Sequence, residues 1–92
     1  MTLARLDINK KISDTFLFKA QELQAKGERY KFRALAYIRA ARAISGLNEG
    51  LDEIYGRSWL TGLQKIKGVG NRLAHDIEKI LLENSLIKKK IV

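Results

Sequence analysis

The sequence predicts an all-α domain, a compact bundle of about five short helices. Three observations favour this class: proline is absent, seven glycines are spaced along the chain, and apolar residues recur at intervals of three and four. No segment shows the alternation of apolar and polar residues that is typical of a strand. The 92 residues suffice for one small domain, which buries roughly 60–65% of the surface that its unfolded chain exposes.

Capping residues and glycines set the expected helix boundaries. Asn9 is expected to be the N-cap of the first helix, and Gly27 the residue that ends it. The helices are expected to span about residues 9–26, 30–45, 49–55, 59–65 and 71–84. We divide the chain into an N-terminal arm (1–8), a domain (9–86) and a basic tail (87–92).

One apolar face of each helix is expected to build the core. The residues on these faces are Ile12, Phe16, Ala20, Leu23, Leu51, Ile54, Leu73, Ala74, Ile77, Ile80 and Leu81. Trp59 is expected to join them. Alanines of the second helix should let its neighbours pack closely.

The net charge of +8 favours an anionic partner, nucleic acid ahead of a membrane surface. A charge excess that serves only solubility is the alternative. The absence of cysteine excludes disulfides and thiolate metal sites. No apolar run reaches about 18 residues, and the N-terminus lacks the apolar segment of a secretory signal. We expect an intracellular monomer that is not secreted: cytoplasmic or nucleoid-associated in a prokaryote, nuclear in a eukaryote.

The stretch IKGVGNRLAHDIEKIL, residues 66–81, joins two expected helices through a turn with two glycines. Such a turn presents the first unpaired amides of the following helix, where the helix dipole favours an anion. Val69 is expected to fill the space between the helices. The residues expected to bind the DNA backbone are Lys67, Gly68, Val69, Gly70, Asn71 and Arg72.

Two other glycine motifs do not fit this turn. A dinucleotide-binding loop is excluded by Leu73 at its third glycine position, and a P-loop by Asn71 and Arg72 after the last glycine. Residues 63–81 instead resemble a helix-hairpin-helix motif, which binds phosphates without reading bases, so that affinity should fall steeply with salt. An ordinary turn between helices, capped by glycines, is the alternative.

Basic residues also follow the second helix. Arg29, Arg33 and Tyr37 lie on one stripe, and Arg39 and Arg42 lie one turn apart on another. Arginine suits phosphate oxygens, and a neighbouring tyrosine can stack on a base or sugar. A solvated basic face with Tyr37 partly in the core is the alternative.

The segment KGERYKFRALAYIRAARAISGLNEGLDEIY resembles the one before the hairpin in the N-terminal domain of family X DNA polymerases. The resemblance covers about residues 9–86 and implies binding at gapped or nicked DNA. It implies a 5′-phosphate pocket formed by Arg33, Tyr37 and Arg72. The supporting basic surface that we expect beside this pocket consists of Arg29, Arg39, Arg42 and Lys79.

The same resemblance implies a monovalent cation, Na⁺ or K⁺, at the hairpin when DNA is bound. Its ligands would be the backbone carbonyls of Gln64, Ile66 and Val69. Gln64 stands where the family has a lysine, which weakens the charge of the pocket. Lys67 stands where the family has a proline, and restores a cation nearby.

Some members of that family use a lysine of this domain to remove 5′-deoxyribose phosphate through a Schiff base. The resemblance places this nucleophile at Asp76, and a carboxylate cannot form an imine. We therefore expect no efficient lyase activity, with Lys67 or Lys79 left as weak nucleophiles. Asp76 is expected to pair with Arg72 or Lys79 on its own helix.

The sequence therefore predicts a sequence-independent DNA-binding module that needs no cofactor and prefers gaps, nicks or 5′-phosphate ends in DNA repair. The first alternative is a deoxyribose-phosphate lyase or the N-terminal domain of a family X repair polymerase. The second is a protein-interaction scaffold whose contact face is the acidic turn at residues 49–53.

Overall fold

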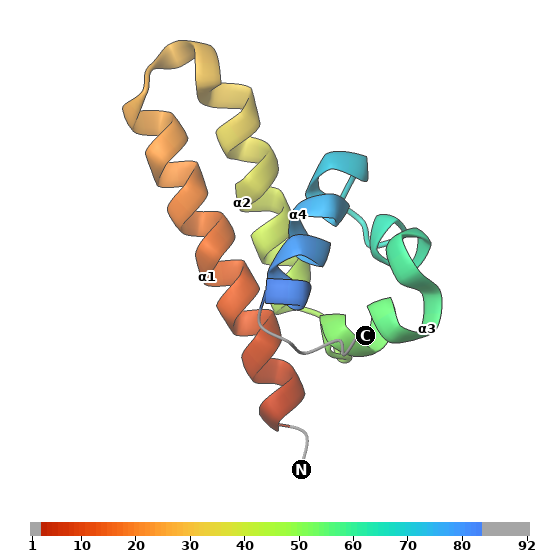
Figure 1. The fold of residues 1–92 in the computed structure, drawn as a ribbon. Helices are drawn as coiled ribbons and strands as arrows, with labels where there is room; N and C mark the ends of the chain where they lie inside the picture. The colour runs from red at the N-terminus through yellow and green to blue at the C-terminus, as the bar shows by residue number, and fades with distance from the viewer. Residues whose placement is uncertain (1–2, 84–92) are drawn as a thin grey trace.

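The computed structural model describes residues 3–83, with side chains from residue 7 onward. Four α-helices account for most of this range: α1 (Leu3–Ala25), α2 (Lys31–Ser45), α3 (Leu51–Gln64) and α4 (Asn71–Glu83), with a 3₁₀ turn, η1 (Glu28–Tyr30), before α2 (Figure 1). The all-α prediction is confirmed, with four α-helices in the described range instead of five. The expected basic tail at 87–92 lies outside it, as do residues 84–86 of the expected domain.

The helices α1 and α2 form a long antiparallel pair, and α3 and α4 lie together on one side of it (Figure 1). Gly27 ends α1 as predicted, since its φ of 117° is one that only glycine adopts easily. Ala40 and Ala41 of α2 are buried, so their small side chains permit the close approach of neighbouring helices. None of the described helices is long and apolar enough to cross a lipid bilayer.

The predicted apolar faces form one core. Its buried members include Ile12, Phe16, Ala20, Leu23, Leu51, Ile54, Leu73, Ala74, Ile77 and Leu81, and Ile80 packs against them half-buried. The expectation for Trp59 is wrong, because its side chain is 55% exposed. It contacts Tyr55 edge to face, with ring centroids 5.2 Å apart.

The third and fourth expected helices are one element, α3, with a break in helical geometry at Trp59. This residue has φ 55° and ψ −148°, a conformation that is uncommon for a bulky side chain. The sequence located the interruption near Gly56, which instead stays within the helix. The break redirects the second half of α3 toward the hairpin (Figure 1).

Asn9 is not the N-cap of the first helix, because α1 begins at Leu3. Residues 3–8 therefore belong to α1 and not to a separate arm. The buried side chain of Asn9 caps α3 instead: its Nδ2 donates to the Glu49 carbonyl and its Oδ1 accepts the Leu51 amide, both at 2.8 Å. An asparagine of α1 thus satisfies one of the amides that α3 leaves unpaired at its start.

Replacing Asn9 by Ala should lower the free energy of unfolding by about 2 kcal/mol, because two buried hydrogen bonds and a helix cap are lost. Urea denaturation followed by circular dichroism measures the change. Asn48→Ala, at an exposed position of the α2–α3 connection, is the matched control and should change stability by less than about 0.5 kcal/mol. Equal effects of the two substitutions would show that Asn9 does not hold α3 to α1.

Candidate nucleic-acid interface

The turn between α3 and α4 lies beside α2 at Gly68. Its φ is +91°, and a Cβ built on it would lie 3.5 Å from the Arg39 carbonyl oxygen. The Val69 amide donates to the Ile66 carbonyl at 2.9 Å, and the Val69 side chain is buried, as predicted. A side chain at position 68 would therefore meet strain from φ and contact with α2 at once.

Gly70 has a different role from Gly68. Its φ is not positive, and a Cβ built on it would meet no atom within 4 Å. The Ala74 amide donates to the Gly70 carbonyl at 2.9 Å, which is the first hydrogen bond of α4. The amides of Asn71, Arg72 and Leu73 therefore precede the helical ladder, and Gly70 has no side chain that would cap or cover them.

The side chain of Asn71 crosses the hairpin instead of capping α4. Its Oδ1 accepts a hydrogen bond from Gln64 Nε2 at 2.6 Å, and a ring nitrogen of His75 lies 3.0 Å from its carbonyl oxygen. Lys67, Gly68, Gly70, Asn71 and Arg72 are exposed. The hairpin thus presents main-chain donors and two cationic side chains at one surface.

The three residues of the expected phosphate pocket come from two helices that meet at Tyr37. Arg33 and Tyr37 belong to α2, and Arg72 belongs to α4. Tyr37 is buried, packs edge to face on Phe16 with centroids 5.1 Å apart, and donates its hydroxyl to Asp76 Oδ2 at 2.6 Å. Burial first, and then the hydrogen bond and charge of Asp76, raise the pKa of Tyr37 to about 12. The charges of Arg72 and Arg33 oppose this rise in pKa, so both side chains lie within electrostatic range of the hydroxyl.

The prediction that Asp76 pairs with Arg72 or Lys79 is wrong. The Asp76 carboxylate accepts a hydrogen bond from the Tyr37 hydroxyl of α2, and among the described residues no ion pair joins Asp76 to either cation. Because the only proton of the Tyr37 hydroxyl points to Asp76, Tyr37 has none left to donate to a phosphate. The exposed guanidinium groups of Arg33 and Arg72 remain as the side-chain donors of this cluster.

A second tyrosine–carboxylate pair holds the other side of α4. Tyr55 of α3 is buried and donates its hydroxyl to Glu78 Oε2. Burial, followed by the hydrogen bond and charge of Glu78, raises the pKa of Tyr55 to about 12. The sequence analysis missed this pair, because the residues lie 23 positions apart and neither has a local signal for it.

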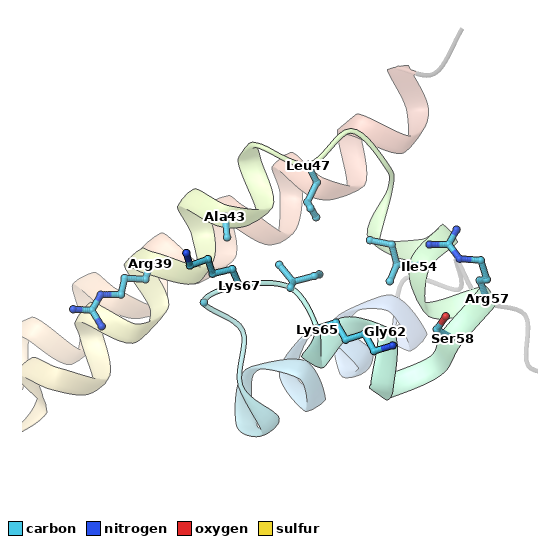
Figure 2. A pocket seen from close by; sticks show the side chains of 11 residues that line it. Arg39, Ala43, Leu47, Ile54, Arg57, Ser58, Gly62, Lys65 and Lys67 are labelled. Atoms are coloured by element: carbon cyan, nitrogen blue, oxygen red, sulfur yellow. The ribbon is translucent and has the colours of Figure 1, made fainter.

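The supporting basic residues do not form one surface. Arg29 belongs to η1, at the distal end of the α1–α2 pair. Arg39 lies beside the hairpin and lines one hollow together with Lys67 (Figure 2). Arg42 lines a separate hollow with Ser13 of α1. Arg39 and Arg42 thus share a helix but face different neighbours.

Two helices, α3 and α4, joined by a tight turn that contains two glycines form a helix-hairpin-helix. A profile of the helix-hairpin-helix domain matches residues 7–86, and the chain belongs to this family. Comparison with curated proteins and with solved structures gave no significant match. Membership of the family implies sequence-independent DNA binding in general.

Replacing Tyr37 by Phe should lower the free energy of unfolding at pH 7 by about 1–2 kcal/mol, because Asp76 loses its donor. Tyr30→Phe, which removes a hydroxyl from a half-buried ring, is the control. Since the pKa of Tyr37 is raised to about 12 from 10, its contribution is fully present below pH 10 and is lost as pH rises toward 12. Stability measured from pH 8 to 11.5 should therefore converge for the wild-type protein and Tyr37→Phe; parallel curves would contradict the hydrogen bond.

Proposed function

We propose that this domain grips the phosphate backbone of damaged DNA and prefers gaps, nicks or 5′-phosphate ends. The observation that carries the proposal is the open start of α4, where the first amides follow Gly70 and no side chain of that residue caps them. Arg72 belongs to the same first turn, and its charge and that of Arg33 both act on the Tyr37 hydroxyl. Main-chain amides and arginine forks are both good phosphate ligands.

The arginine pair supports a preference for a terminal phosphate. A phosphate monoester carries a charge of about −1.5 to −2 near neutral pH, whereas an internal diester carries a single one. Arg33 from α2 and Arg72 from α4 approach from two helices, so a terminal group can meet both cations together. Tyr37 would then position α4 and not bind the phosphate itself, since its proton points to Asp76.

The resemblance of residues 9–86 to the N-terminal domain of family X repair polymerases supports a role as such a module. This role includes the same binding at gaps, nicks or 5′-phosphate ends. Lyase chemistry gains no support at position 76. Asp76 is a carboxylate that accepts a hydrogen bond from the Tyr37 hydroxyl. A Schiff base needs an amine at this position.

A monovalent cation would complete the hairpin site in this proposal. The carbonyl oxygens of Gln64, Ile66 and Val69 are the ligands that we assign to it. Ile66 already accepts the Val69 amide, and a carbonyl oxygen keeps a second lone pair for a metal. A bound Na⁺ or K⁺ would add positive charge where a DNA phosphate meets the turn, and the exposed Lys67 adds charge at the same turn.

The acidic turn offers less to a protein-scaffold function than the sequence suggested. Glu49 pairs with Arg57 at 3.0 Å, and Glu53 accepts the Gly50 amide at 3.4 Å at the start of α3. These carboxylates have roles within the fold, so the turn by itself gives no argument for a contact face.

Replacing Gly70 by Val should weaken binding to a gapped duplex at least about tenfold, because a side chain would project into the open space before the α4 amides. The helix content should stay unchanged, with a stability loss below about 1 kcal/mol. Gly56→Val, at an exposed glycine of α3 whose Cβ also meets nothing within 4 Å, is the matched control. Fluorescence anisotropy measures affinity; wild-type affinity in Gly70→Val would remove these amides from the interface.

Replacing Arg33 and Arg72 together by Gln should abolish the preference for a 5′-phosphorylated gap over a 5′-hydroxyl gap. We expect about a tenfold preference in the wild-type protein, from one or two charge-assisted hydrogen bonds. The slope of log affinity against log salt should also become shallower by about 2. Lys19→Gln, an exposed position on α1, is the control. Equal affinity of the wild-type protein for both gaps would disprove the terminal-phosphate pocket while leaving backbone binding intact.

A further inference from the structure

An open groove of about 1010 Å³ lies between α2, α3 and the hairpin, on the flank of the candidate DNA site (Figure 2). Its volume is at the upper end of the range of small-molecule pockets, about 300–1,000 Å³. Figure 2 shows Ala43 and Leu47 on the α2 side, across from Ile54 and Gly62 of α3. Nothing in the sequence analysis predicted this groove.

The floor of the groove is aliphatic. It consists of Ala43, Leu47, Ile54 and Ile66. Ala43, Leu47 and Ile66 are only half-buried, and Leu47 and Ile66 pack against the core. Covering such side chains with an apolar partner is favourable by about 25 cal/mol per Å² of apolar area.

The rim of the groove is cationic. Arg39, Arg57, Lys65 and Lys67 are exposed, and no acidic side chain occurs among the described residues that line the groove. Arg57 pairs with Glu49 at the surface, at 3.0 Å. The groove therefore combines an apolar floor with a strongly positive edge.

Single-stranded nucleic acid matches the charge of the rim but not the floor. Proteins that hold single strands present aromatic rings on which the bases stack. The described lining residues include no aromatic side chain, and the nearby Trp59 is not one of them. The segment Lys88–Lys90 of this chain has the same sign of charge as the rim, so attraction does not draw it to the groove.

An amphipathic helix with acidic flanks matches both features. Such helices place an apolar stripe into a groove while their polar sides face the rim. Carboxylates beside the stripe would meet Arg39, Lys65 and Lys67, and the stripe would cover Leu47 and Ile66. We propose that this groove is a docking site for an acidic amphipathic helix of a partner protein.

The proposal goes beyond DNA binding, and it places the partner next to the DNA. Lys67 and Gly68 belong to both the groove and the hairpin. An acidic helix in the groove would lower the positive potential at the hairpin, so partner and DNA should weaken each other's binding by the same factor.

A designed peptide of about 15 residues tests the docking site. It carries leucines at positions i, i+3, i+4 and i+7 and glutamates elsewhere, with a shuffled peptide of equal composition as control. Titration into the ¹⁵N-labelled wild-type domain should shift the amide resonances of Ala43, Leu47, Ile54 and Lys65. The shuffled peptide, and the same leucine pattern with lysines in place of glutamates, should not shift them.

Two substitutions outside the DNA-binding residues give the affinity test. Leu47→Glu changes the floor and Lys65→Glu the rim, and each should weaken peptide binding at least about tenfold in fluorescence anisotropy. Lys19→Glu on α1 reverses an exposed charge away from the groove and should leave the affinity unchanged. The neutral variant Leu47→Gln should lose peptide affinity to a similar extent and should keep its affinity for gapped DNA within twofold, because it adds no charge beside Lys67. This separates the result from failure of the proposed DNA binding.

Several results would overturn the proposal. Binding of the acidic peptide no tighter than that of the shuffled one would show that the groove does not select an amphipathic helix. Shifts outside the groove would place the peptide elsewhere. Resonance shifts of the groove residues on addition of oligo(dT), or on raising the protein concentration alone, would assign the groove to a single strand or to a second copy of the chain.

Discussion

The hydrogen bond between Tyr37 and Asp76 is the contact on which the candidate site depends. It joins α2 to α4 across 39 residues and thereby sets the direction in which the first amides of α4 point. The Tyr55–Glu78 pair holds the same helix from α3. A helix of only 13 residues is too short to be stable alone, so its orientation must come from such contacts and from the apolar face that it buries.

This use of Asp76 explains how the site departs from the family it resembles. The resemblance implies a lysine at this position, where an amine serves covalent chemistry. A carboxylate there accepts a hydrogen bond from the Tyr37 hydroxyl. It makes the cluster less positive than a lysine would and leaves Arg33 and Arg72 as the cations that act on this hydroxyl. The arrangement is suited to holding an anion and has no amine at position 76, which is why binding is the function that we propose.

Local patterns predicted the parts of the structure that depend on neighbours in sequence. The spacing of Ile12 and Phe16 predicted the buried face of α1, and Gly27 predicted where this helix ends. The hairpin glycines gave the turn, although only Gly68 has a positive φ. What could not be predicted depends on residues brought together by packing: Asn9 caps a helix 42 positions away, and Tyr37 donates its hydroxyl to Asp76 of another helix. The groove could not be predicted either, because three segments that are separate in the sequence form its walls.

The position of Lys67 links the two surfaces of the hairpin in one electrostatic argument. Lys67 is exposed at the turn that we propose binds DNA, and it also lines the groove. Charges at the surface act over about 8–10 Å in physiological salt, so a carboxylate in the groove acts on a phosphate at the turn. The hairpin turn lies beside α2 at Gly68, where a Cβ would come within 3.5 Å of the Arg39 carbonyl oxygen. Coupling between the two ligands therefore requires no conformational change, only the charge that each brings to the same lysine.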